Sequence, residues 1–343
     1  MSEYGRKTYV EVIYEGKNIS KVLTDDLKAF SYKDNINSCD EISITVLDRD
    51  EKWLKDWITL KGDEITAKII TEDKGKKSTL DCGTFFLDDK DFGQGWFQFK
   101  GISIDITSTM KNEEKTKMWT KTSLKKIAQT IATQEKLAYK FTGKDVSIAQ
   151  AQQKNQSNGG FLQQICVQHG FSVKIIKKTL YVAELSDLES LEADLIIEKA
   201  YCNQDWKINE TDNDTYTKCI IEYKDPVLAK KVKGEASIKR LGYKKEPEKS
   251  FKITDSQGVK GKTVEEINKQ LNKIASGKLR EKNQEELSVS LSLMGNTKIV
   301  SGRTLRLKGW GQYDNYKYII LSAEHSYGDG YRVSVEARRC LNI

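Results

Sequence analysis

Apolar and polar residues alternate along the chain from Tyr9 to about Asp105. Short runs rich in β-branched and aromatic residues recur there between polar turns: YVEVIY, LKAFSY, EISITVL, DEITAKII, GTFFLDD and WFQFKGISI. A period of two places successive side chains on opposite faces of a strand, and repeated short strands are typical of an antiparallel sandwich or barrel. We therefore predict a first β-barrel domain over residues 1–105.

One segment of this region, DRDEKWLKDWITLKGDEI, breaks the alternation with two tryptophans among many charges. Asp48 and Asp50 can cap a short helix, in which Trp53 and Trp57 would share one face because they lie four residues apart. Gly62 and the residue after it would then turn the chain back into a strand. Carboxylates beside an arginine are also common in catalytic sites, but in this β context we predict a structural joint anchored by both tryptophans.

Near residue 106 the spacing of the apolar residues changes from that of a strand to that of a helix. Two stripes of apolar residues occur at helical spacing: Leu124, Ile127, Ala128 and Ile131 behind a Thr122 or Ser123 cap, and Phe161, Leu162, Ile165 and Cys166 before Gly170. The sequence FSVKIIKKTLYVAE then predicts a hairpin that turns at Lys177 and Lys178. Residues 106–190 are therefore expected to form a small α+β domain.

Strand patterns return after this unit in two blocks. DWKINE and YTKCIIEYKD precede Pro226, and LSVSLSL, TLRLKGWG, YKYIILSAEHSY and YRVSVEARR follow much later. Between them lies a basic stretch and then a helical stripe from Val264 to about Leu279. We predict a second β-barrel domain over 191–225 and 286–343, split by a basic insertion with one helix over 226–285. The fold class is thus mainly β with an α+β insertion.

Composition is consistent with a soluble, globular chain of about two domains. The 343 residues are 38% hydrophobic and 31% charged, and no apolar run approaches the roughly 18 residues of a transmembrane helix. The N-terminus leads directly into strand-like sequence without a signal-peptide pattern, which predicts a cytoplasmic protein. The six cysteines are scattered without a C-x-x-C pair, so we expect reduced, packed thiols.

The net charge of +7 is concentrated in one segment. Residues 226–262 contain eleven Lys or Arg against four acidic residues, which accounts for the whole excess. The lysines of such a segment could bind the phosphates of a nucleic acid, and Tyr243 and Phe251 could stack on its bases. Nucleic-acid binding through 226–262 is therefore the alternative hypothesis, although a solvated loop or a protein interface is the more common use of such a stretch. The basic candidates within it are Lys239, Arg240, Lys244 and Lys245.

Enzymatic motifs are incomplete. SFKITDSQGVKGKTVEEI resembles a phosphate-binding P-loop, but Ser256 stands where its first glycine should be, and no α/β sheet pattern surrounds it. Thr263 with Glu266 three residues later forms a capping box that explains the same residues without a ligand.

The two histidines, His169 and His325, lack neighbours that would complete a metal site or a catalytic triad. We expect His169 to end a helix, where a partial positive charge suits the dipole, and His325 to be a hydrogen-bonded residue in a strand. Adjacent acids such as Asp88 and Asp89 are typical of solvated turns. We therefore predict no catalytic residue, metal or cofactor.

Three blocks of the sequence resemble the phage late control D family, the tail hub proteins of contractile phage tails and related particles. The first is EISITVLDRDEKWLKDWITLKGDEITAKI followed by CGTFFLDD and FKGIS. The second is SLKKIAQTIA followed by FLQQICVQHGFSVKIIKKTLYV, and the third is GNTKIVSGRTLRLKGWGQYDNYKYIILSAEHSYGDGYRVSVEARR. The match covers nearly the whole chain, and the basic insertion matches least.

The resemblance implies two β-barrels of tail-hub type with a small α+β domain, in a trimeric ring that adapts a six-fold tail tube to a three-fold spike. It implies a homotrimer with the tail tube, spike and baseplate wedge proteins as neighbours, the tape measure protein as a further candidate, and no catalysis. We expect no membrane partner, and a nucleic acid only under the alternative hypothesis. The chain would assemble in the bacterial cytoplasm and then belong to a virion or a phage-tail-like bacteriocin. The candidates for structural or interface roles are Trp53, Trp57, Trp310, His325, Lys239, Arg240, Lys244 and Lys245.

Overall fold

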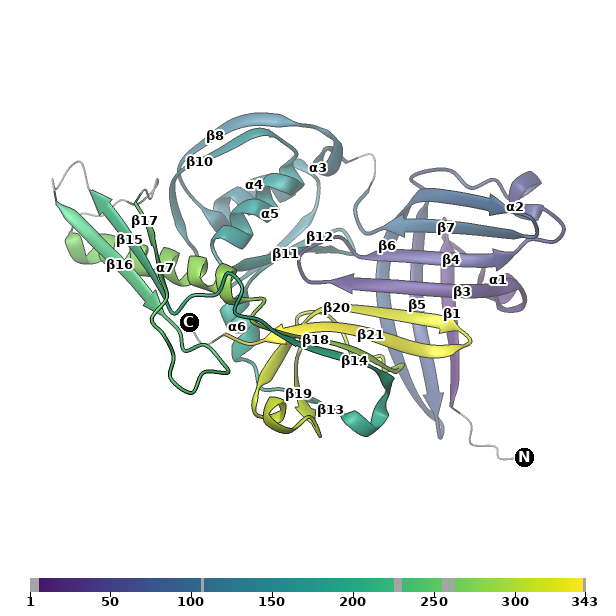
Figure 1. Cartoon of the computed structure of the whole chain (residues 1–343). Helices are drawn as coiled ribbons and strands as arrows, with labels where there is room; N and C mark the ends of the chain where they lie inside the picture. The colour runs from purple at the N-terminus through teal and green to yellow at the C-terminus, as the bar shows by residue number, and fades with distance from the viewer. Residues whose placement is uncertain (1–5, 106–107, 225–229, 255–258, 260–262, 342–343) are drawn as a thin grey trace.

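The computed structural model describes residues 6–105, 108–224, 230–254, 259 and 263–341, apart from the side chains of residues 203 and 204. The fold is mainly β with an α+β unit set between β regions, as the sequence predicts (Figure 1). Four hydrophobic clusters correspond to four parts of the chain: the first β region, the α+β unit, the second β region and the insertion.

The first β region forms because its strands bury alternate side chains. In β4, for example, Ile42, Ile44 and Val46 are buried and the residues between them are not. Its core also contains Phe85, Phe97 and other aromatic residues. The elements of this region are β1 (Lys7–Tyr14), β2 (Lys17–Asn18), α1 (Ser20–Asp26), β3 (Leu27–Asn35), β4 (Glu41–Leu47), α2 (Lys52–Lys55), β5 (Glu64–Asp73), β6 (Lys76–Gly93) and β7 (Trp96–Ile102).

The second β region comes from both sides of the insertion and joins the first through a pairing of β20 with β3. Its elements are β13 (Leu195–Glu198), η1 (Lys199–Tyr201), β14 (Cys202–Glu210), β18 (Leu287–Met294), β19 (Thr304–Lys308), η2 (Gly311–Asn315), β20 (Lys317–Gly328) and β21 (Gly330–Arg339). Pairings among the described residues run from β14 through β18, β21, β20, β3, β4, β7, β6, β5 and β1 to β2. The two regions thus share one sheet.

The α+β unit packs α4 and α5 inside a long curved ribbon of β8 and β10 (Figure 1). Both predicted apolar stripes are buried, Ser123 caps α4, and the hairpin turns at Lys177 and Lys178, which have positive φ angles. The elements are α3 (Thr109–Asn112), β8 (Lys115–Ser123), α4 (Leu124–Gln134), β9 (Ala138–Thr142), β10 (Ser147–Gln156), α5 (Asn158–Gln168), β11 (Phe171–Ile176), β12 (Thr179–Glu184) and α6 (Leu185–Ser190).

The insertion is larger than the sequence predicts. It contains β15 (Lys218–Lys224), β16 (Lys231–Ser237), β17 (Ser250–Ile253) and α7 (Val264–Asn283). Because β15 pairs with β16 and β17 and packs on α7, the predicted boundary at 225/226 is wrong: the YTKCIIEYKD strand belongs to the insertion. The apolar stripe of α7 is buried against this small sheet as expected, and the helix continues one turn beyond Leu279.

Buried ion pairs join these parts. Lys174 on β11 pairs with Asp34 and with Asp40, whose Oδ1 lies 2.9 Å from the ammonium, and it donates to the Ser301 hydroxyl. This three-way joint, hereafter the Lys174 joint, ties the α+β unit to both β regions. Breaking one partner of such a pair is costly because it leaves a buried charge uncompensated.

A second buried network surrounds Glu189 of α6. Its carboxylate accepts from Arg280 of α7 at 2.6 Å, from Arg338 of β21 at 2.7 Å and from the backbone N–H of Leu341 at 2.8 Å. The insertion, the α+β unit and the C-terminal strand are thereby held at one point. All six cysteines are free thiols, as the sequence predicts.

Candidate functional site

A short helix, α2, forms in the predicted segment, but it ends at Lys55, so Trp53 lies in it and Trp57 lies just beyond it. Trp53 is buried, and its ring lies 5.2 Å from the ring of Phe97 and 5.7 Å from that of Phe99. Trp57 meets Trp53 edge to face at 5.1 Å and remains 38% exposed. Trp53 therefore anchors the helix to the core of the first β region, and the prediction that both tryptophans are anchors is wrong for Trp57, whose ring reaches the surface.

The two predicted capping aspartates also differ. The Oδ1 of Asp48 accepts the backbone N–H of Trp53 at 3.3 Å, whereas Asp50 is exposed and pairs with the side chain of Lys52. The residue at the cap position is Glu51, whose φ of 54° lies in the left-handed region. The predicted turn is present, since Gly62 has a φ of 93°.

An exposed apolar surface surrounds α2. Five large side chains form it, and we call them the α2 surface: Leu54, Trp57, Ile58, Leu60 and Phe92. Ile58 is 71% exposed and Leu60 is 60% exposed. Phe92 stacks on Phe97 at 4.5 Å, and the buried ring of Phe97 stacks on Trp53, so the core links Phe92 on β6 to α2. Exposed apolar side chains gathered in this way mark contact surfaces for other proteins.

His325 is fully buried between aromatic rings. Its Nδ1 lies 2.8 Å from the hydroxyl of Tyr331, and its Nε2 lies 2.9 Å from the carbonyl oxygen of Ile299. Because a carbonyl only accepts, Nε2–H donates to it and Nδ1 accepts from Tyr331. Burial lowers the pKa of His325 to about 4, so the ring is neutral near pH 7. The expectation of a hydrogen-bonded strand residue is confirmed, and its surroundings suit a packing role.

Trp310 is also buried. It lies between Gly309 and Gly311, whose φ angles of 98° and 68° form the turn that the Gly-Trp-Gly sequence suggests, and its ring meets that of Trp206 edge to face at 6.3 Å. This tryptophan supports the second β region from inside. Trp206, 39% exposed, is the ring nearer the surface.

The basic segment is partly neutralised. Lys239, Lys244 and Lys245 are exposed, but Arg240 is buried. The Arg240 guanidinium pairs with Asp212, lies 3.2 Å from Glu246 and packs on the ring of Tyr243. Arg240 therefore stabilises the fold of the insertion and is not available to a nucleic acid.

The ring of Phe251, the other predicted base-stacking residue, packs 4.7 Å from that of Tyr216. In the P-loop-like stretch, residues 255–258 and 260–262 lie outside the described residues. Its capping box is confirmed at Thr263, whose hydroxyl oxygen accepts the Glu266 backbone N–H at 3.2 Å.

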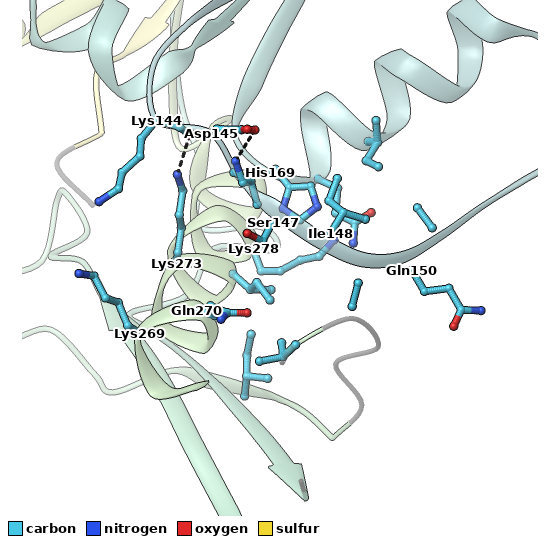
Figure 2. Close-up of a pocket in the computed structure, with 18 of the residues that line it drawn as sticks. Lys144, Asp145, Ser147, Ile148, Gln150, His169, Lys269, Gln270, Lys273 and Lys278 are labelled. Carbon is cyan, nitrogen blue, oxygen red and sulfur yellow. Dashed lines mark hydrogen bonds between the residues drawn. The ribbon is translucent and has the colours of Figure 1, made fainter. Parts of the chain in front are cut away.

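A cavity of about 760 Å³ lies between the α+β unit and the insertion (Figure 2). β10 and α5 line one side, and α7 lines the other. Apolar side chains such as Ile148, Ile165 and Ile274 contribute to its wall, and four lysines border it: Lys144, Lys269, Lys273 and Lys278. No sequence motif brings these segments together.

His169 also borders this cavity. It ends α5 as predicted, but burial, together with the nearby charges of Lys273 and Lys278, lowers its pKa to about 4. The expected positive charge at the helix end is therefore wrong, because desolvation and two ammonium groups outweigh the helix dipole.

The described residues hold neither a metal-ligand cluster nor a membrane-spanning helix. They contain no group of three or more His, Cys, Asp or Glu side chains placed to hold a metal ion. Among the helices in the same ranges, none combines the length and apolarity that crossing a bilayer requires.

No protein-family model matches the chain, and no curated protein matches it in sequence. Solved structures do match. The tail protein from Neisseria meningitidis MC58 aligns over 96% of both chains with a TM-score of 0.66 and 11% identity. This chain has the fold of a phage tail protein. The 43 kDa tail protein of prophage MuSo2 from Shewanella oneidensis aligns over 96% of both chains, with a TM-score of 0.64 and 10% identity.

A secretion-system protein shares this fold as well. The E. coli c3393 protein, a component of the type VI secretion system with structural similarity to the T4 tail proteins gp27 and gp5, has a TM-score of 0.53 and 7% identity. The alignment covers 96% of this chain and 76% of that one. The fold is thus common to phage tails and a related secretion apparatus.

Proposed function

We propose that the chain is a structural hub protein of the baseplate in a contractile phage tail or a phage-tail-like particle such as a bacteriocin. The observation that carries the proposal is the fold match over 96% of two tail proteins of nearly the same length. A match of this extent includes the α+β unit and both β regions together, and it leaves little of the chain for another activity.

The proposed assembly is a ring of three chains. Each chain offers two β regions joined edge to edge through β3 and β20. Three copies related by a three-fold axis would present six β regions to a six-membered tube ring and three equivalent surfaces to a trimeric spike. The tube, spike and wedge proteins are the proposed neighbours, with the tape measure protein as a further one.

The α2 surface is the proposed contact in this ring. When a neighbouring chain covers large apolar side chains that are exposed in a single chain, the burial is favourable by roughly 25 cal/mol per Å² of apolar area. Trp57, with its rigid ring held by Trp53, resembles the aromatic anchors that dominate many protein interfaces.

We propose no catalysis by this chain. His325 fits this proposal because its two ring nitrogens are engaged by Tyr331 and by the backbone carbonyl of Ile299 inside the fold. In the particle the chain would be part of the virion after assembly in the bacterial cytoplasm.

Multi-angle light scattering at micromolar concentration, alone and with the spike protein, tests the proposal. The expected mass of the hub is about three times the 39.1 kDa of one chain. The variant L54S/I58S/L60S should lose this assembly, and Met294→Ser, a change at a 65% exposed residue of β18, is the matched control. A strict monomer in both conditions would contradict the proposal.

A further inference from the structure

The strand β10 has one paired edge and one open edge. Among the described residues it pairs only with β8, in a two-stranded antiparallel sheet. In an antiparallel ladder, alternate residues direct their N–H and C=O groups away from the partner strand. An edge of this kind is a template for a further strand, and two-stranded sheets gain stability from a third.

The open edge borders the cavity. Every residue from 144 to 152 lines it, whereas a strand that only turned one face to the cavity would contribute alternate residues. Apart from the ladder with β8, no backbone–backbone hydrogen bond joins residues 147–152 to another described part of the chain. The open edge of β10 therefore borders the cavity over these residues.

The opposite wall is one face of α7. Lys269 and Lys273 lie four residues apart on it, as do Gln270 and Ile274, so this face presents both ammonium groups and apolar carbons. Figure 2 shows Lys144, Lys269 and Lys273 along one side of the cavity. Ile148 and Ile165 contribute apolar surface from the α+β side.

Lysines outnumber acidic residues in the lining of the cavity, and two of these lysines are exposed without an ion pair among the described residues. Four lysines border it against Asp145 and Glu266, and Oδ1 of Asp145 already accepts the backbone N–H groups of Lys125 and Val146. Lys273 pairs with Glu184 at 3.2 Å, and Lys278 pairs with Glu281 at 2.8 Å. Lys144 and Lys269 are exposed and form no ion pair with any residue that the structure describes.

We propose that this cavity binds an extended, acidic segment of a partner protein, which adds to the open edge of β10 as a third strand. Alternate side chains of the segment would face the apolar wall, and carboxylates on the other side would pair with Lys144 and Lys269. The volume lies in the range of ligand pockets, which suits a short segment and not a folded domain.

A protein segment explains the cavity better than a nucleic acid does. Single-stranded nucleic acids stack on exposed aromatic rings, whereas Phe161, the one Phe, Tyr or Trp in the described lining, is 3% exposed. The free N–H and C=O groups along an open strand edge form a regular hydrogen-bond ladder only with another polypeptide backbone. This inference does not depend on the proposed function, since it concerns a surface remote from the α2 surface.

Fluorescence anisotropy with a labelled peptide of alternating glutamate and valine tests the proposal on the full chain. The peptide should bind, and the peptide of alternating lysine and valine should not. The variant K144E/K269E should weaken binding at least tenfold. The control K244E/K245E, which reverses two exposed lysines away from the cavity, should leave it within twofold.

Hydrogen exchange distinguishes strand addition from loose charge attraction. Amides in residues 147–152 should exchange at least tenfold more slowly when the peptide is bound. Absence of binding up to millimolar peptide, or binding without this protection, would overturn the proposal, as would an oligo-dT that binds equally well and competes. Light scattering should give K144E/K269E the same mass as the unaltered protein. Loss of peptide binding in this variant can then be distinguished from a failure of the proposed trimer.

Discussion

Trp53 and Trp57 are four residues apart and their rings touch, yet their surroundings differ. Trp53 packs against Phe97 and Phe99 inside the first β region, while Trp57 lies outside at the α2 surface. Spacing alone predicts a shared face. Which ring that face buries depends on how α2 sits over β7, and this is a tertiary relationship that the local sequence does not contain.

The two tryptophans should therefore respond differently to truncation. Trp53→Ala removes a buried ring and should lower the free energy of unfolding by about 3–5 kcal/mol. Trp57→Ala should lower it by less than about 1 kcal/mol, as for other surface changes, but should weaken assembly. Urea denaturation followed by circular dichroism measures the first effect, and light scattering measures the second. Equal losses of stability would contradict the assignment.

Gly234 of β16 is required for close packing. A Cβ at this position would lie 2.3 Å from the Cβ of Leu271 and 2.5 Å from its carbonyl carbon. Gly234→Ala should therefore push α7 away from the sheet and destabilise the insertion by about 1–3 kcal/mol. Thermal denaturation tests this, with Gly160→Ala in α5 as the control because its nearest atom is 3.4 Å away. A neutral Gly234→Ala variant would show that the two elements are not in contact.

Asp40 in the Lys174 joint should make stability depend on pH. Burial raises its pKa to about 6 from an ordinary 3.8, and the charge of Lys174 opposes part of that rise. Since the folded state binds the proton more tightly, the contribution is present below about pH 3.8 and is lost as the pH rises through about 6.

The unfolding free energy of the unaltered protein, relative to that of Asp40→Asn, should accordingly fall between about pH 4 and about pH 7. Lys174→Met should move the midpoint of this change to higher pH, because it removes the positive charge that lowers the pKa. Chemical denaturation across this pH range measures both effects. A difference that is flat with pH would contradict the description of the joint.

Elements are predictable wherever one period dominates. The stripes of α4, α5 and α7 and the hairpin at Lys177 and Lys178 follow from local spacing and are present. The sequence pattern of β15 predicts a strand, which is present, but it does not show which strand β15 pairs with. The prediction therefore places β15 in the second β region, whereas it pairs with β16 in the insertion. The cavity cannot be predicted from the sequence, because its lysines come from two distant segments of the chain. The Lys174 joint cannot be predicted either, because Asp34 and Ser301 lie far from Lys174 in the sequence.

The insertion should bind nucleic acid weakly or not at all. Arg240 pairs with Asp212 and Glu246, and its guanidinium packs on the ring of Tyr243, so this arginine and this ring are engaged within the chain. Lysines at the surface are the remaining candidates for phosphate contact. Reversing Lys239, Lys244 and Lys245 to glutamate should leave DNA retention on a filter unchanged at low salt. A large, salt-dependent loss would favour the nucleic-acid alternative.

The whole molecule is one continuous set of β strands with two smaller units attached, and buried ion pairs fix those units in place. Such a scaffold presents several surfaces at defined angles, which is what a connector between symmetric rings needs. The overall class and the resemblance to tail hubs are accessible from sequence because three separate blocks occur in order. The number of copies in the assembly cannot be worked out from the residue pattern of one chain, because that pattern does not show how copies are related by symmetry.

Electron cryomicroscopy of the intact particle would decide whether this chain is a baseplate hub. We predict density for three copies of the chain in a ring at the baseplate, between the tail tube and the spike, with the α2 surface covered by a neighbour. Density for the chain elsewhere in the particle, a ring of another copy number, or its absence from purified particles would contradict the proposed role.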